Sequence, residues 1–93
     1  MADRLSYRFQ VIVDGRRFDT DRFEEYAHRY GTGTTRSLIR TKAGEWYEVL
    51  RTIWQGARDA VTHIATDEAK AIIAEYEHPD TYEALFGEVE RAE

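Results

Sequence analysis

The chain of 93 residues contains no cysteine and no long apolar run. Without cysteine the fold carries no disulfide, and no thiolate can act as a nucleophile or as a metal ligand. No apolar stretch approaches the roughly 18 residues that a membrane span needs, and the first residues contain no apolar signal-peptide segment. We therefore expect a cytoplasmic protein that has no membrane partner.

Motifs for catalysis or metal binding are also missing. The segment from Gly31 to Thr35 has the glycines of a phosphate-binding loop, but it follows a predicted helix instead of leading into one, and the characteristic lysine is absent. Asp59, His63 and Asp67 have helical spacing, but no H-E-x-x-H motif accompanies them. We expect no cofactor, no metal ion and no enzymatic activity.

Charge is distributed unevenly along the chain, whose net charge is −5. Residues 1–58 contain 11 Lys and Arg against 8 Asp and Glu, a net of +3. Residues 59–93 contain 2 against 10, a net of −8. A mildly basic part is thus followed by a strongly acidic part, and each could attract a partner of the opposite sign.

The N-terminal residues predict a β-hairpin over 5–20. Apolar residues alternate with polar ones from Leu5 to Val13, which is typical of a half-buried strand. Asp14-Gly15 is a favoured two-residue turn because both positions tolerate positive φ. This turn places Phe18 opposite Val11, so that both side chains face the core.

The remaining sequence predicts four helices, over about 21–30, 43–64, 67–77 and 80–91. Asp21-x-x-Glu24 resembles a helix-capping box, and apolar residues recur at helical spacing in each segment. Residues 31–41 are expected to form a loop, with a short third strand at 35–40 as an alternative. A further alternative pairs Ser37–Thr41 with Glu45–Leu50 as a hairpin. Its strands would carry large apolar groups on both faces, which favours the long helix.

These segments predict a single α+β domain over residues 1–93. An N-terminal β-hairpin, with or without a short third strand, packs against about four α-helices, and the C-terminal two thirds is rich in helix. A domain of this size buries roughly 60–65% of its unfolded surface, which leaves little room for an enclosed active-site cavity.

The main candidate for a binding surface lies on the predicted 43–64 helix. Tyr47, Arg51, Trp54 and Arg58 share an arc beside the apolar stripe of that helix. Aromatic residues and Arg are enriched in binding hot spots, so this face could anchor a protein partner or stack on a base. The alternative is that Tyr47 and Trp54 widen the buried face and that the Arg side chains cover them.

The acidic C-terminal third is a second candidate surface. Its carboxylates could meet a basic surface on a partner or on a second copy of this chain, or they could simply face solvent. The residues that we single out in this part are Glu83, Glu88 and Glu90.

A loose basic group in the first part is the candidate for nucleic-acid binding. Several cations on one face are needed for such binding, and the acidity of the whole chain opposes it. The residues that we single out for this binding are Arg16, Arg17, Arg36 and Arg40, with Lys42 beside them in the predicted loop region.

These observations favour a non-enzymatic protein-binding module that occludes a functional surface of a larger protein or protein complex. Small acidic domains without cysteine or motifs are common among phage and mobile-element accessory proteins, including anti-CRISPR inhibitors of host defence. This analogy extends the prediction to such an inhibitor. The alternatives are a nucleic-acid-binding regulator that uses the Arg-rich half and a structural or assembly subunit that forms homo-oligomers.

Overall fold

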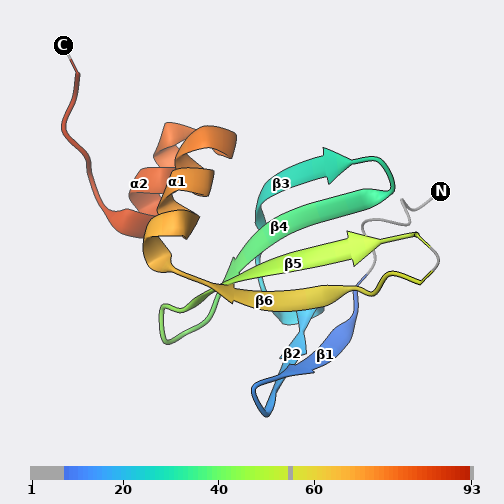
Figure 1. Cartoon of the computed structure of the whole chain (residues 1–93). Helices are drawn as coiled ribbons and strands as arrows, with labels where there is room; N and C mark the ends of the chain where they lie inside the picture. Colours follow the sequence, from blue (N-terminus) through green and yellow to red (C-terminus); the bar gives the residue numbers. More distant parts are fainter. Residues whose placement is uncertain (1–7, 55, 93) are drawn as a thin grey trace.

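Residues 8–54 and 56–92 are described by the computed structural model, in which antiparallel sheets are followed by α-helices (Figure 1). Within these residues, β1 (Gln10–Val13) pairs with β2 (Arg16–Asp19), and a 3-10 turn follows at Thr20–Arg22. A meander then pairs each strand with the next in the order β3 (Tyr26–Gly31), β4 (Thr34–Arg40), β5 (Trp46–Thr52) and β6 (Ala60–Ile64). The helices are α1 (Thr66–Tyr76) and α2 (Pro79–Phe86).

The architecture combines strands and helices, but it is rich in strand. The prediction of a hairpin packed against about four helices, with a helix-rich C-terminal two thirds, is therefore wrong. In the part of the chain that the structure describes, the segments predicted as the first two helices form strands and loops, and only the last two form α-helices.

The predicted N-terminal hairpin forms, and Val11 lies opposite Phe18 as expected. Asp14 and Gly15 make the turn, with φ of 51° and 76°. Positive φ at both positions is what a tight turn between twisted strands requires. The expected start of the first strand, residues 5–7, lies outside the described residues.

Residues 21–30, predicted as a helix, form the end of the 3-10 turn and strand β3. No α-helix begins here, so no capping box forms, and the Glu24 carboxylate instead accepts a hydrogen bond from the Tyr26 hydroxyl. A β-bulge between Tyr26 and Arg29 interrupts the alternation of the strand. At the bulge the adjacent residues Tyr26 and Ala27 both pack into the core. Two consecutive buried residues do not fit the alternation of a strand, which is why the apolar spacing of this segment favours a helix in the sequence.

Residues 43–64 form β5, a loop and β6 in place of the predicted long helix. The alternative that pairs Ser37–Thr41 with Glu45–Leu50 is confirmed, since Ser37 lies opposite Val49 and Ile39 lies opposite Tyr47. Strand β5 carries large apolar groups on both faces because both faces are covered. A doubly buried strand loses its two-residue alternation, and its apolar residues then fit a helical pattern equally well.

The helices α1 and α2 lie close to their predicted positions. His78 caps α2 through its Nδ1 atom, which accepts a hydrogen bond from the Asp80 backbone N–H, and Pro79 occupies the first turn. Helix α2 ends at Phe86, earlier than predicted, because Gly87 with φ of 98° leaves the helical conformation. No helix among the described residues is long and apolar enough to cross a membrane.

The four-stranded sheet is the middle layer of the molecule and separates two apolar clusters (Figure 1). On one face the β1–β2 hairpin contributes Phe18, which packs with Ile39 and Tyr47. On the other face α1 and α2 pack on Leu38 and Trp46. Neighbouring residues of β4 and of β5 therefore point into different clusters.

A carboxylate at the end of α1 ties down the bulge in β3. Ala27 is fully buried and has φ of 54°, a conformation that costs a residue with a Cβ atom on the order of 1–2 kcal/mol. Its backbone N–H donates a hydrogen bond to Glu77 Oε2. This contact joins the sheet to the helical layer and supplies a partner for an amide at an irregular position of the strand.

Replacement of Glu77 should destabilise the fold. Glu77→Ala leaves the Ala27 amide without its acceptor, and we expect a loss of about 1–3 kcal/mol in the free energy of unfolding, measured by urea denaturation. Glu75→Ala, an exposed change of the same kind on the same helix, should have little effect. Equal losses for the two variants would contradict the role given to this hydrogen bond.

Candidate functional site

The four residues of the predicted helical face do not share a helix. Tyr47 and Arg51 lie in β5, with only 3% and 2% of their surfaces exposed. Trp54 and Arg58 lie in the loop between β5 and β6 and are exposed. The structure therefore divides the set into a buried pair and two loop residues.

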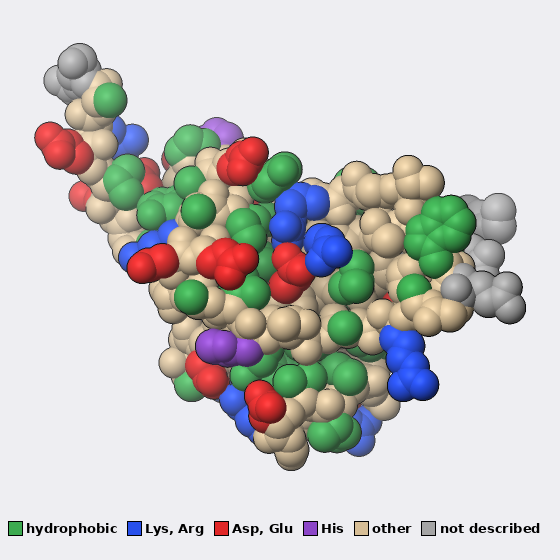
Figure 2. Space-filling model, viewed as in Figure 1, with side chains coloured by type: hydrophobic (Ala, Val, Ile, Leu, Met, Phe, Trp, Pro, Cys, Tyr) green, Lys and Arg blue, Asp and Glu red, His purple; other side chains and the backbone are tan. Residues whose placement is uncertain are grey.

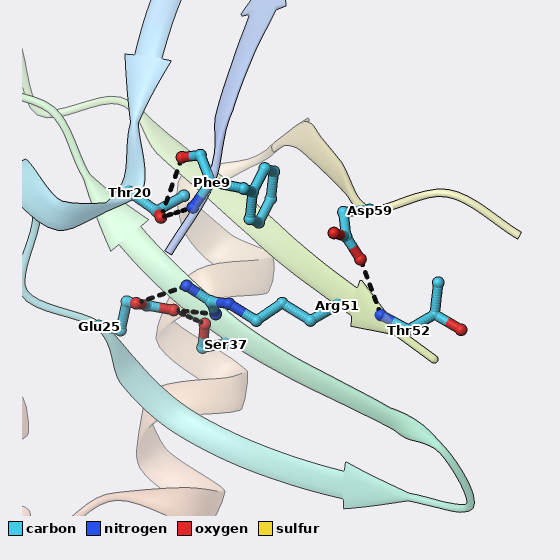
Figure 3. A network of polar contacts seen from close by, with 7 residues as sticks. All are labelled: Phe9, Thr20, Glu25, Ser37, Arg51, Thr52 and Asp59. Carbon is cyan, nitrogen blue, oxygen red and sulfur yellow. Dashed lines mark hydrogen bonds and ion pairs between the residues drawn. The ribbon is translucent and has the colours of Figure 1, made fainter. Parts of the chain in front are cut away.

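Arg51 is held in a buried ion pair with Glu25, which immediately precedes β3 (Figure 3). Its Nη1 and Nη2 atoms donate to the two carboxylate oxygens at 2.6 and 2.9 Å. The Ser37 hydroxyl donates to the same carboxylate at 2.5 Å. On the other side, the Arg51 guanidinium lies 5.5 Å from the centre of the Phe9 ring. Arg51 therefore joins β5, β4 and the chain before β1, and its role is structural.

The Glu25 carboxylate is held in its charged form by this network. Burial by itself raises the pKa of Glu25, but hydrogen bonds from Arg51 and Ser37 and the Arg51 charge outweigh burial, so the pKa lies below the ordinary value of 4.5. Removing either partner would leave the other as an unpaired buried charge, which is costly.

Three exposed apolar side chains lie at the end of the sheet opposite the helices, and we call Tyr30, Ile53 and Trp54 the tryptophan tip. They expose 69%, 49% and 54% of their surfaces, respectively. Tyr30 is near the end of β3, and the other two follow β5. Hydrophobic atoms reach the surface at this end of the molecule in Figure 2. An exposed apolar group of this kind is typical of an interaction site.

Trp54 is fixed in place despite its exposure. Its indole N–H donates to the Thr32 carbonyl oxygen at 2.8 Å, and the Ile53 backbone N–H donates to the Gly33 carbonyl oxygen at 3.0 Å. Gly33 has φ of 71°, and a Cβ atom at that position would lie 2.7 Å from Trp54 Nε1. The β3–β4 turn therefore needs glycine both for its backbone conformation and for the close approach of the indole.

The acidic residues of the second candidate surface lie on and after α2. Glu83 is largely buried against the C-terminal segment: it accepts a hydrogen bond from the Val89 backbone N–H at 3.0 Å and lies 3.5 Å from Arg91. Glu88 and Glu90 are exposed in the segment that follows the helix. In the view of Figure 2, acidic side chains lie together with basic ones in the region of α2 and the segment that follows it.

Three of the four residues in the predicted nucleic-acid group come together. Arg16, Arg17 and Arg40 line a groove of 540 Å³ between the β1–β2 hairpin, the start of β3 and the β4–β5 turn. Arg36 lies elsewhere, on the face of the sheet that carries the helices, where it pairs with Glu48 at 2.7 Å. We call the groove the basic groove.

The basic groove also contains residues that the sequence pattern did not group with these arginines. Arg22, Phe23 and Tyr26 line it, and Glu24 is the acidic residue of its lining. Lys42, which the sequence did place beside the arginines, lines it as well. Because Arg22 and Phe23 lie in a segment predicted as a helix, the sequence pattern does not indicate that they approach the β4–β5 turn. The feature of the sequence that comes closest to indicating the groove is the net positive charge of residues 1–58.

The predicted absence of a metal site and of catalysis stays a prediction. Among residues 8–54 and 56–92 no group of three or more His, Asp or Glu side chains could hold a metal ion. Asp59 instead accepts a hydrogen bond from the Thr52 backbone N–H at 2.9 Å, and His63 packs edge-on against Tyr47. These two residues stabilise the ends of β5.

No protein-family model matches the chain, and neither a curated protein nor a solved structure matches it. The tryptophan tip and the basic groove are the two candidate interaction sites in the part of the chain that the structure describes.

The Glu25–Arg51 pair should make stability dependent on pH in the acid range. Because the pKa of Glu25 is lowered on folding, its contribution is fully present above about pH 4.5 and is lost as the pH falls through the folded-state pKa. Glu25→Gln should cost about 3–5 kcal/mol at neutral pH, because it leaves Arg51 buried without a counter-charge. Urea denaturation between about pH 3 and pH 7 should show a weaker acid dependence of the unfolding free energy for the variant. An unchanged pH profile would show that the pair does not control acid stability.

Gly33→Ala should displace the Trp54 side chain. The added methyl group would overlap the indole, so we expect a shift of the Trp54 indole N–H resonance and faster exchange of its proton with solvent. Gly44→Ala is the matched control, since Gly44 also has positive φ but has nothing within 4 Å of the added Cβ atom. Both variants bear the backbone strain of about 1–2 kcal/mol. An indole resonance that moves equally in both would contradict the proposed contact.

Proposed function

We propose that this protein is a non-enzymatic binding module that docks onto a larger protein by inserting the tryptophan tip into a pocket of that partner. One observation carries the proposal: Trp54 exposes 54% of its surface while its indole N–H is hydrogen-bonded to the Thr32 carbonyl oxygen. A large aromatic side chain with a fixed orientation at the surface has the chemistry of a binding hot spot.

The exposed apolar surface supplies the driving force. A whole aromatic side chain buries roughly 150–250 Å², and Trp54 exposes 54% of its surface. At about 25 cal/mol per Å², covering this exposed part would contribute roughly 2–3 kcal/mol. Ile53 and Tyr30 add to this area. Because the indole is already held in place, binding costs little further side-chain entropy.

The position of the tip favours a concave partner. The β3–β4 turn and the loop after β5 form the end of the sheet that lies farthest from α1 and α2 (Figure 1). A projecting side chain buries most of its surface only inside a pocket, and a larger protein is the partner that offers one. The module would then exclude other ligands from that pocket, which is the occlusion mechanism that the sequence suggested.

Two narrower predictions remain predictions. The first is that the partner is a host-defence complex and that this chain comes from a phage or a mobile element. The second is that the acidic residues Glu83, Glu88 and Glu90 take part in the contact.

Photo-crosslinking should identify the contact directly. A benzophenone amino acid is placed at position 53 in one preparation, which leaves Trp54 intact, and at position 76 in another, because Ile53 and Tyr76 expose similar fractions, 49% and 51%. Each is irradiated in an extract of the source organism. We expect a discrete adduct from position 53 alone. Excess unlabelled wild-type protein should suppress it, whereas Trp54→Ala should compete about tenfold less well or worse.

Three outcomes would contradict the proposal. The first is an adduct pattern that is the same for positions 53 and 76. The second is full competition by Trp54→Ala. The third is an adduct with twice the mass of the chain, which would identify a second copy as the occupant and support the alternative of a homo-oligomeric assembly subunit.

A further inference from the structure

The basic groove collects positive charge in a protein that is acidic overall. Its cations come from segments that are distant in the sequence: the β1–β2 hairpin, the 3-10 turn, and the region where β4 leads into the next turn. They are Arg16, Arg17, Arg22, Arg40 and Lys42. The lining carboxylate is Glu24, and Asp19 and Glu45 pair with three of the arginines from beside the groove. Among the lining residues and their direct ion-pair partners, five cations stand against three carboxylates, a difference of +2, whereas the whole chain has a net charge of −5.

Two of these cations have no carboxylate partner among the residues that the structure describes. The Arg40 guanidinium donates to the Leu85 carbonyl oxygen at 3.0 Å and lies 5.8 Å from the centre of the Trp46 ring, and both of these partners are uncharged. Lys42 is exposed at the β4–β5 turn. A further two, Arg17 and Arg22, share the single carboxylate of Asp19.

Half-buried aromatic rings lie beside these charges. Phe23 and Tyr26 line the groove, and Phe23 stacks on the buried Phe18 ring at 6.1 Å. Tyr26 packs edge-on against Trp46 at 6.0 Å. An aromatic face next to guanidinium groups suits a ligand that combines a planar ring with negative charge.

We propose that the basic groove binds a free nucleoside di- or triphosphate. A volume of 540 Å³ falls within the roughly 300–1,000 Å³ typical of small-molecule sites. A ligand of that size meets several cations only if it carries several negative charges on few atoms. Phosphate groups do so, and Arg binds them through paired hydrogen bonds. The planar base would lie against Phe23.

The surroundings of the groove favour a small ligand over a nucleic-acid strand. A strand needs cations along a track of several nucleotides. Arg36, the remaining member of the predicted basic group, lies outside the groove and is paired with Glu48. A free nucleotide needs only the cations that line the groove itself.

Titration of labelled protein with ATP, without added metal ion, tests the site. We expect saturable amide shifts confined to the lining of the groove, which lies in β2 and in residues 20–26 and 40–43. The variant Arg22→Gln/Lys42→Gln should bind about tenfold more weakly or worse, because two charge contacts are lost. Both side chains are exposed, so the fold should be kept. The control Arg36→Gln/Arg58→Gln removes the same charge outside the groove and should bind ATP like the wild type.

Further probes separate the competing ligands. Inorganic triphosphate should bind at the same residues but more weakly than ATP, since it lacks the ring. Trp54→Ala should bind ATP normally, which keeps this site independent of the tryptophan tip. The proposal is overturned if ATP produces no saturable shifts, or if the control variant loses as much affinity as the groove variant. It is also overturned if a single-stranded oligonucleotide or a polyglutamate peptide binds the groove more tightly than ATP.

Discussion

Strands β4 and β5 are covered on both faces, by the β1–β2 hairpin on one side and by α1 and α2 on the other. A charged side chain in the covered part of this pair has to find a partner there, because an unpaired buried charge is too costly to keep. Arg51 meets this requirement through Glu25, which also accepts the Ser37 hydroxyl (Figure 3). Because both faces of β5 are covered, Arg51 is part of the core, although arginine is a residue type that is common in binding sites.

The same cover leaves the ends of the sheet as the places where ligands can approach. Strand β4 runs from the tryptophan tip at Thr34 to the basic groove at Arg40. At about 3.4 Å per residue, the two ends lie roughly 20 Å apart. A protein partner at the tip and a small anion at the groove would therefore not compete for space. The turns that form these sites are held by backbone hydrogen bonds, such as that from Gly44 to Thr41.

Local patterns determined which elements could be predicted. The hairpin depends on alternation and on Asp14-Gly15, and α1 on a contiguous apolar stripe, so both follow from neighbouring residues. The apolar run of β5 faces two layers built from distant segments, and nothing within the run distinguishes a doubly buried strand from a helix. The fates of Arg51 and Trp54 depend on partners 26 and 22 residues away, Glu25 and Thr32. Spacing along the chain cannot reveal such contacts.

The fold also determines which cations are available to a ligand. Some of the positive charge of residues 1–58 is neutralised by ion pairs within the protein, because Arg29 and Arg36 both pair with Glu48 and Arg51 pairs with Glu25. Arg36 is separated from Arg16 and Arg17 by its position and not by its pairing, since all three form ion pairs and only Arg36 lies outside the groove. Lys42 lies at a turn and meets no carboxylate among the described residues. The positive charge that is left without a partner, and not the charge of the whole chain, is what would attract an anion to the basic groove.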